Sequence, residues 1–478
     1  MKKEVDCLLV GYLGFGYTSI NENLSCAGLN NIKIEKDFNA AVAYLGTYLN
    51  KHKISFDYIN YIEDEKENLE NKLKTCDIKA IGISTTYCTS MEEVQNIVSY
   101  IGRIKPNNSV KTILGGAYIA KLFGDPDLQN EVVLKHILKK IGADFYIDSF
   151  QGETALTNVL LALKNNISFS NIPNIYYKEG NIYKYTLKIP EDNNLEDNIV
   201  DWSLFSNNVG SIVPVRTTIS CPFSCSYCSY HINAGKFRYT NIDSIEKELN
   251  SIQKLEKVKT VHFIDDTFNV PVQRFKDILR MMIKNKYHFN WCSFIRCQYL
   301  DEEAVQLMKD SKCIGTFLGI ESGSQEILNR MNKKVTIEEL KRGNALLEEY
   351  GINRFGSFII GFPGETDDTI NDTISFINDI NLKYYGACTW YYDPRTPISK
   401  YKDEYRIKGK DYSWKHYTMD IKTAIDKTNY VISSVKNAHH FVQDPTWLFQ
   451  VLDSGIKYEE IENLIPHNPT QFSTKNLV

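Results

Sequence analysis

The sequence predicts an α/β protein: a doubly wound parallel sheet comes first, a (β/α)6 partial barrel follows, and a small, mostly helical region ends the chain. Short apolar runs alternate with amphipathic stretches of about 10–15 residues, the pattern of parallel strands joined by helical crossovers. This alternation is interrupted over residues 166–212. The 478 residues also exceed what one hydrophobic core usually contains, so two or three domains are expected.

The composition is that of a globular protein, with 43% hydrophobic and 24% charged residues. A net charge of −4 gives no basis for binding nucleic acid or an anionic membrane. The apolar runs stay well short of the roughly 18 residues that a transmembrane helix needs. The first of them, at 5–12, is also shorter than a signal peptide requires. We therefore expect a cytoplasmic protein.

Residues 1–165 are predicted to form the doubly wound, Rossmann-like domain. Its expected strands are 5–12, 55–61, 78–85, 110–118 and the beginning of the run 144–164. Its expected helices are 38–52, 65–76, 91–104, 132–143 and the remainder of that run. Such sheets bind ligands at the carboxyl ends of their strands, so the loops there are the candidate binding loops.

Residues 166–212 are expected to connect the domains. The run 171–185 has Lys-Glu-Gly-Asn near its centre, which predicts a β-hairpin. The polar run 190–198 is expected to be a linker.

Residues 213–393 are predicted to form the barrel, a partial TIM barrel with its chemistry at the carboxyl ends of the strands. The expected strands are 213–220, 260–267, 290–296, 316–321, 355–361 and 384–392. The expected helices are 242–256, 271–285, 301–311, 325–331, 336–350 and 366–379. Residues 394–478 are expected to cap the substrate, with helices near 419–436 and 457–464.

The chain has eleven cysteines, which in the cytoplasm are expected to be thiols or metal ligands rather than disulfides. Three of them, Cys221, Cys225 and Cys228, lie close together directly after a predicted strand. The others are isolated and are expected to be small buried residues. These are Cys7, Cys26, Cys76, Cys88, Cys292, Cys297, Cys313 and Cys388.

Three thiolates on one loop indicate a metal site. A structural zinc site needs four ligands, and His231 is the one nearby candidate for the fourth. A four-iron cluster normally takes four cysteines, so three leave one iron open for chemistry. The spacing Cys-x3-Cys-x2-Cys after the first barrel strand favours the cluster over zinc.

This motif, with the aromatic Tyr227 before its last cysteine, resembles that of the radical S-adenosylmethionine (SAM) enzymes. The resemblance implies that Cys221, Cys225 and Cys228 hold one 4Fe–4S cluster, whose open iron chelates the amino and carboxylate groups of SAM. One electron from an external donor of the flavodoxin or ferredoxin type then yields a 5′-deoxyadenosyl radical. It also implies that Tyr227 packs near the adenine.

Two further strand ends fit the same resemblance. It implies that Asp265 and Asp266 accept hydrogen bonds from the methionyl ammonium; alternatively, they cap the helix 271–285. It implies that Arg296, at the end of the third strand, meets the methionyl carboxylate; alternatively, Arg296 forms a surface ion pair.

The ends of the fourth and fifth strands also fit the resemblance to radical SAM enzymes. Glu321 and Ser322 are expected to contact the ribose and carboxylate of SAM, or to cap the following helix. Gly361, Pro363 and Gly364 resemble the adenine-side motif of the cobalamin-associated radical enzymes, in which glycines let the backbone approach a ligand.

A doubly wound domain before such a barrel resembles the cobalamin-binding subfamily of radical SAM enzymes; the alternative is an ordinary flavodoxin-like domain with turn glycines. The motif Asp-x-His-x-x-Gly, which supplies a cobalt ligand in other cobalamin proteins, is absent from the sequence. The cobalamin contacts that the resemblance implies are Ser84, Thr85, Thr86, Gly115, Gly116, Gly152 and Glu153.

Within that subfamily the chain looks most like the group named for phosphinothricin-type P-methylases. The resemblance implies methyl transfer from methylcobalamin to an sp3 carbon, or to phosphorus, of a peptide or small natural-product precursor. The alternatives are a radical rearrangement, cyclisation or oxidation in the same architecture, or a cobalamin or cluster sensor. The aromatic run 390–393 is expected to line the substrate pocket or to pack as a lid on the barrel mouth.

Overall fold

The structure, a computed structural model, describes residues 2–13, 34–128, 130–441 and 445–456. Two compact units make up the chain, one of residues 1–15 and 38–208, the other of residues 16–37 and 209–478. The helix predicted near 457–464 lies outside the described residues, as does Cys26.

The first unit is built on a seven-stranded sheet with the order β2-β1-β3-β4-β5-β6-β7. Its first five strands are parallel and have the flavodoxin-like order 2-1-3-4-5, as a doubly wound domain requires. The strands are β1 (Lys3–Val10), β2 (Phe56–Ile59), β3 (Cys76–Ser84), β4 (Lys111–Gly115), β5 (Phe145–Ile147), β6 (Ile175–Glu179) and β7 (Ile182–Tyr185).

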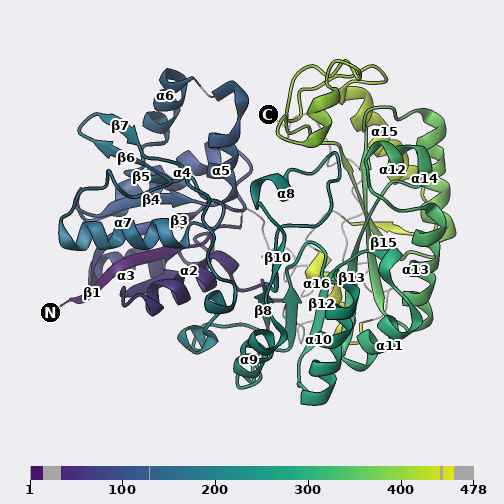
Figure 1. Cartoon of the computed structure of the whole chain (residues 1–478), viewed down its shortest axis with the longest axis horizontal. Helices are drawn as coiled ribbons and strands as arrows, with labels where there is room; N and C mark the ends of the chain where they lie inside the picture. Colours follow the sequence, from purple (N-terminus) through teal and green to yellow (C-terminus); the bar gives the residue numbers. More distant parts are fainter. Residues whose placement is uncertain (1, 14–33, 129, 442–444, 457–478) are drawn as a thin grey trace. The chain divides into compact units, whose positions relative to one another are not determined.

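Helices cover both faces of this sheet (Figure 1). One face packs against α3 (Lys66–Thr75), α4 (Met91–Ile104), α5 (Ala117–Gly124) and α6 (Glu131–Ile141). The other packs against α2 (Ala40–Lys51) and α7 (Glu153–Asn165). Helix α4 matches its predicted range, because a capping box of Ser90 and Glu93 marks its start in the sequence.

The predicted hairpin forms, but it belongs to the first sheet rather than to a linker. Strand β6 pairs antiparallel with β5, with Tyr176 opposite Tyr146. Ile175 and Tyr177 are buried against the sheet, so the apolar alternation of the hairpin is satisfied there. The first unit therefore continues to residue 208, beyond the boundary of 165 expected from the sequence.

The second unit contains a parallel sheet with the order β16-β15-β14-β13-β12-β11-β8, so the six predicted barrel strands occur in chain order. The short β16 extends its edge. The strands are β8 (Ile212–Val215), β11 (Thr260–Phe263), β12 (Asn290–Ile295), β13 (Cys313–Glu321), β14 (Asn353–Ile360), β15 (Tyr384–Thr389) and β16 (His439–His440).

The first barrel strand is shorter than the predicted run 213–220. After β8 the chain turns, and β9 (Thr218–Ile219) pairs antiparallel with β10 (Arg238–Tyr239) instead. The loop that carries the cysteines thus leaves the barrel through a small second sheet.

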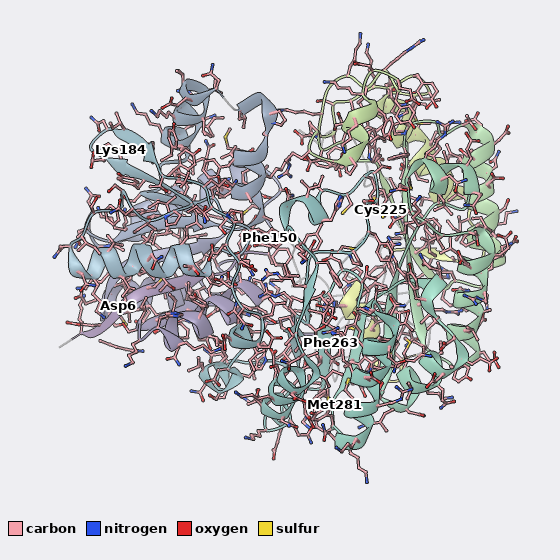
Figure 2. The ribbon with its side chains drawn as sticks, in the orientation of Figure 1. Asp6, Phe150, Lys184, Cys225, Phe263 and Met281 are labelled. Atoms are coloured by element: carbon pink, nitrogen blue, oxygen red, sulfur yellow. The ribbon has the colours of Figure 1, made fainter. Side chains whose placement is uncertain are left out.

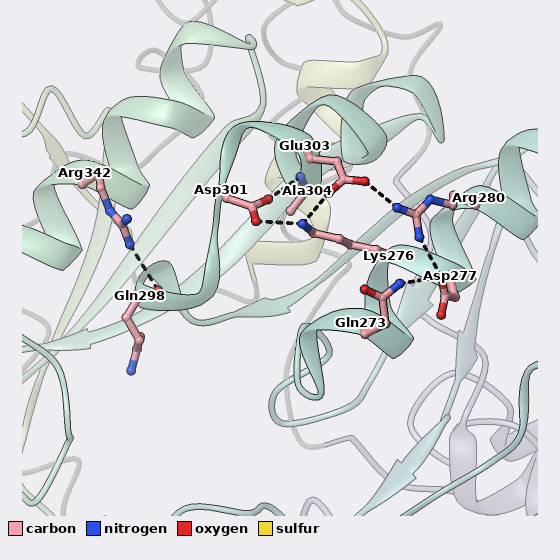
Figure 3. Close-up of polar contacts among 9 residues, drawn as sticks. All are labelled: Gln273, Lys276, Asp277, Arg280, Gln298, Asp301, Glu303, Ala304 and Arg342. Atoms are coloured by element: carbon pink, nitrogen blue, oxygen red, sulfur yellow. Dashed lines mark hydrogen bonds and ion pairs between the residues drawn. The ribbon is translucent and has the colours of Figure 1, made fainter.

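Helices follow the barrel strands as predicted, and polar contacts join neighbouring ones on their outer side. Lys276 of α10 donates to Asp301 and Glu303 over 2.7 Å each, at the start of α11 (Figure 3). Arg280, one turn later, pairs with Glu303. The helices are α9 (Ile242–Ile252), α10 (Val272–Asn285), α11 (Glu302–Asp310), α12 (Gln325–Arg330), α13 (Ile337–Glu349) and α14 (Asp367–Asp379).

The C-terminal region adds α15 (Ile421–Ser434), which was predicted, and α16 (Pro445–Asp453), which was not. Phe449 of α16 packs against β13, where a Cβ on Gly315 would lie 2.4 Å from its ring. Gly315 therefore makes room for α16. Across the described residues, every helix is too short or too polar to span a membrane.

Candidate cofactor site at the strand ends

The cysteine loop begins at Ser220, whose φ of +70° turns the chain out of β9. Ser226, between the second and third cysteines, fastens the loop from two sides. Its N–H donates to the carbonyl of Met331 (2.8 Å) and its hydroxyl to that of Arg330 (2.9 Å). Its own carbonyl accepts from the N–H of Ile398 (3.0 Å). The loop is thus held between the turn after α12 and the C-terminal region.

The three thiols lie close together within this loop (Cys225 is labelled in Figure 2). Cys225 is buried, and Cys221 and Cys228 are half-buried. Burial raises the pKa of Cys228 to about 11, and the neighbouring Cys225, Asp266 and Cys221 add to the shift. A cationic metal centre nearby would favour the thiolate form of Cys228.

The arrangement fits a cluster better than a single ion. Within the described ranges, no three His, Cys, Asp or Glu side chains come together closely enough to hold one metal ion. His231, the candidate fourth zinc ligand, has no hydrogen-bond partner for its Nδ1 and joins no such group. In an iron–sulfur cluster the cysteines bind different irons, so their sulfurs need not converge on one point.

A buried polar triad adjoins the cysteine loop. The hydroxyl of Tyr227 donates to Glu321 (2.8 Å), and Lys333 donates both to Glu321 (2.8 Å) and to the Tyr227 oxygen (3.1 Å). Burial and the charge of Glu321 raise the pKa of Tyr227 far above its usual range, so its hydroxyl keeps its proton. The two predicted residues are therefore in contact, and Lys333 is a third member that sequence reasoning missed.

Glu321 sits on a strained backbone. Its φ of +72° is left-handed, and the register of β13 against β14 shifts between Gly319 and Glu321. For a residue with a Cβ, this conformation costs roughly 1–3 kcal/mol and occurs preferentially at functional sites. The strain aims the carboxylate at Tyr227 and Lys333 rather than along the strand.

The turn after α12, residues 331–334, makes contacts to the cysteine loop that sequence reasoning missed. Besides Lys333, its Asn332 donates to the carbonyl of Ser224 (2.8 Å) in the cysteine loop. Both Asn332 and Lys334 have positive φ. The available sequence signal was Asn-Lys-Lys directly after a short predicted helix, a polar run where the next helix had not yet begun.

The two aspartates after β11, Asp265 and Asp266, differ in their burial and in their hydrogen bonds. Asp265 is buried and accepts from the N–H groups of Thr217 (2.7 Å) and Thr218 (2.8 Å), so it holds the turn that leads into the cysteine loop. Neither aspartate caps α10, which starts after Pro271 without a side-chain cap. That alternative is wrong.

Asp266 remains accessible to solvent, although protein surrounds it. Burial, opposed by a hydrogen bond from Tyr230, and the charge of Asp265 raise the pKa of Asp266 to about 7. Of the two aspartates, Asp266 is the one placed to meet a cation.

The loop after β14 packs tightly against other parts of the protein. Gly361 and Gly364 have φ of +93° and +100°, and Pro363 is buried with them. A Cβ on Gly361 would lie 2.6 Å from Ala424 of α15, so the close approach is to protein. Glu365, also buried, accepts from the N–H of Gly361 and fixes the loop, while burial raises the pKa of Glu365 to about 8.

Ser322 is fully buried, and its hydroxyl accepts from the N–H of Ser324 (3.1 Å) just before α12. The aromatic run behaves as a lid, because Trp390 and Tyr392 are buried in one cluster with Trp414. This burial favours packing in the lid over lining the substrate pocket for these two rings.

In the first unit, the loops after β3 and β4 contact each other. The hydroxyl of Thr85 donates to the carbonyl of Gly115 (2.8 Å), so it is directed into the protein. Ser84 donates to Thr86 (3.1 Å), and Thr86 is the exposed member of the three. Gly116 has φ +105°, and a Cβ there would lie 2.9 Å from the Thr86 nitrogen.

The remaining predicted pair, Gly152 and Glu153, lies at the start of α7. Both residues are hydrogen-bonded to the polar run 190–198 that follows the hairpin. Gly152 donates to Glu191 (3.2 Å), whose carboxylate thus occupies the start of the helix. Glu153 is buried and accepts from Asn193 (3.2 Å) and Asn198 (2.9 Å). Gly152 and Glu153 therefore fasten the run 190–198 to the first unit.

Comparisons with known proteins agree with this geometry. Residues 215–377 match the profile of the radical SAM superfamily. Among curated proteins, the chain is 26% identical over 241 residues to an uncharacterized methyltransferase of Pyrococcus horikoshii, covering 49% of this chain and 52% of that protein. It is 25% identical over 312 residues to the bacteriochlorophyllide d C-12(1)-methyltransferase of Chlorobaculum tepidum, covering 64% and 62%. The matches thus span about half to three fifths of these relatives.

Among solved structures, the fold resembles the radical SAM methyltransferase TsrM from Kitasatospora setae, with a TM-score of 0.63 at 15% identity over 83% of this chain and 76% of that one. It also resembles the cobalamin-dependent radical SAM enzyme OxsB, with a TM-score of 0.61 at 18% identity over 80% and 53%. Residues 215–377, with the three-cysteine loop at the end of the first barrel strand, therefore match the radical SAM superfamily.

Proposed function

We propose that the chain is a cobalamin-dependent methyltransferase that acts on an sp3 carbon, or on phosphorus, of a peptide or small natural-product precursor. The observation that carries the proposal is the presence, in one chain, of a three-cysteine loop and a doubly wound sheet of order 2-1-3-4-5. The relatives support it, since two are named as methyltransferases and TsrM has been solved with cobalamin and a 4Fe–4S cluster.

The chain's own residues would bind, orient and shield the cofactors. Cys221, Cys225 and Cys228 would hold the cluster, and Asp266 would meet the ammonium of SAM. When bound, the cluster supplies the electron that cleaves SAM, and cobalamin carries the methyl group. The neutral Tyr227 and the Lys333–Glu321 ion pair behind it would fix the wall beside the cluster.

Cobalamin would bind at the carboxyl edge of the first sheet, where the strand order reverses between β1 and β3. The exposed Thr86 and the side-chain-free Gly115 and Gly116 lie at this edge.

Anaerobically reconstituted protein tests the proposal. With cobalamin, SAM and a one-electron reductant, we expect 5′-deoxyadenosine together with S-adenosylhomocysteine, even before the substrate is known. The matched control replaces all three loop cysteines with alanine and should yield neither. 5′-Deoxyadenosine alone would point to a rearrangement, cyclisation or oxidation, and a protein that binds cobalamin but cleaves no SAM would be a sensor; either result would refute methyl transfer.

Gly116→Ala tests the cobalamin edge. The added Cβ needs a left-handed backbone and collides with Thr86, so we expect roughly tenfold weaker cobalamin binding with full iron content. Gly180→Ala is the matched control, because Gly180 has φ +60° with nothing within 4 Å of its Cβ. Equal cobalamin binding by the two variants, measured by equilibrium dialysis, would place the cofactor elsewhere.

A further inference from the structure

Arg296 follows β12, and its side chain is directed at the cysteine loop. One guanidinium nitrogen, Nη2, donates to the Sγ of Cys225 over 3.1 Å, and the other, Nη1, donates to the carbonyl of Lys333 over 3.0 Å. The ring of Phe223 lies 3.6 Å from the guanidinium carbon. Arg296 is only 7% exposed, so its charge is buried and the surface ion pair expected as one alternative is wrong.

This buried charge is not neutralised by a carboxylate. Through the described parts of the chain, no ion pair includes Arg296, whereas the similarly enclosed Arg354 and Arg395 pair with Glu348 (3.2 Å) and Asp393 (2.6 Å). A buried guanidinium without an anion costs several kcal/mol, which a nearby negative charge would offset. Of the two groups that accept hydrogen bonds from its guanidinium among the described residues, the one that can become an anion is the Cys225 thiol.

The backbone of Arg296 is also fixed. Asn269, fully buried, accepts from the N–H of Arg296 (3.0 Å) and donates to its carbonyl (2.9 Å). Phe223 in turn stacks on Tyr299 with ring centroids 5.8 Å apart. The backbone of Arg296 is therefore clamped, one face of its guanidinium is covered, and Nη1 is held by Lys333, which directs Nη2 at the sulfur.

We propose that Arg296 is the counter-ion of the Cys225 thiolate and raises the reduction potential of the cluster that this cysteine holds. Reduction adds one electron and no proton to the cluster, so a cation and an N–H···S hydrogen bond stabilise the reduced form more than the oxidised form. Arg296 is thus a positioning residue acting through Cys225, and not the partner of the methionyl carboxylate. The proposal rests on the three cysteines holding the cluster.

The test is a redox titration of the reconstituted full-length protein, followed by the electron paramagnetic resonance (EPR) signal of the reduced cluster. Arg296→Met should keep iron and sulfide bound but shift the midpoint potential to a more negative value. Arg354→Met, which removes a similarly enclosed arginine paired with Glu348, is the matched control and should leave the potential unchanged. An unchanged potential in Arg296→Met, with loss of SAM binding instead, would overturn the proposal in favour of the methionyl carboxylate.

A second measurement needs no variant that might misassemble. Wild-type protein labelled with guanidino-¹⁵N arginine should show a ¹⁵N coupling to the reduced cluster in pulsed EPR. Among the hydrogen bonds of the described residues, Arg296 is the arginine that donates to a loop sulfur, so this coupling is expected to report its contact. A cluster without ¹⁵N coupling would overturn the proposal, whereas failure of the wild type to bind iron at all would instead refute the cysteine assignment.

Discussion

Cys225→Ala is expected to abolish cluster assembly and, with it, the cleavage of SAM. Cys225 is the most buried of the three loop cysteines, and its sulfur accepts the hydrogen bond from Arg296. Its removal takes away one of three ligands and leaves a buried guanidinium without a potential anion. We expect iron and sulfide to fall to the level of the unreconstituted protein, and 5′-deoxyadenosine to fall to background.

The matched control is Cys297→Ala. Cys297 immediately follows Arg296 and is 2% exposed, but burial raises the pKa of its thiol to about 12, so it stays neutral. This substitution should cost about 1–2 kcal/mol of stability through a small cavity and leave the cluster intact. Equal iron content in Cys225→Ala and Cys297→Ala, measured after anaerobic reconstitution, would contradict the assignment of the cluster loop.

The features that the sequence predicted well are those that depend on residues close together in the chain. The cysteine loop is local, so its spacing alone indicates a three-cysteine metal site. Barrel strands and helices also follow from local periodicity and caps, as the range of α4 shows. Parallel strands bring their ends to one edge, so Glu321 and Tyr227 could both be assigned to a SAM site, although the hydrogen bond between them was not predicted.

The failures involve contacts that no local pattern encodes. Asp265 stands at the predicted strand end, but a turn in β8–β9 presents two N–H groups to it. Lys333 reaches Glu321 only because a short helix returns the chain to the barrel mouth. The hairpin 171–185 was assigned to a linker because its pairing with β5 depends on the whole first sheet.

Lys333→Met is expected to destabilise the barrel more than other lysine substitutions. The side chains of Lys333 and Glu321 are 6% and 11% exposed, and removing the cation leaves the carboxylate buried with a hydrogen bond from Tyr227 but no counter-charge. Breaking such a pair costs about 3–5 kcal/mol, and replacing both partners restores much of it. We therefore expect the double variant Glu321→Gln/Lys333→Met to be more stable than Lys333→Met in urea titrations. Tryptophan fluorescence can report this, since four of the five tryptophans lie in the second unit.

Lys276→Met is the matched control for this loss of stability. The ammonium of Lys276 also pairs with carboxylates, but those of Asp301 and Glu303 are about half exposed, so water compensates them when the lysine is removed (Figure 3). Its substitution should cost no more than about 1 kcal/mol. If Lys333→Met and Lys276→Met unfold at the same urea concentration, burial of the Lys333–Glu321 pair does not increase its contribution to stability.

The double variant also separates stability from function. Its uncharged pair should restore folding and let the loop bind iron, yet it removes the lysine that holds Glu321 against the Tyr227 hydroxyl. We expect it to cleave SAM at least roughly tenfold more slowly than the wild type, because a misplaced wall beside the reacting groups costs that much or more. Full SAM cleavage by a stable double variant would show that the strained Glu321 and its lysine serve only the fold.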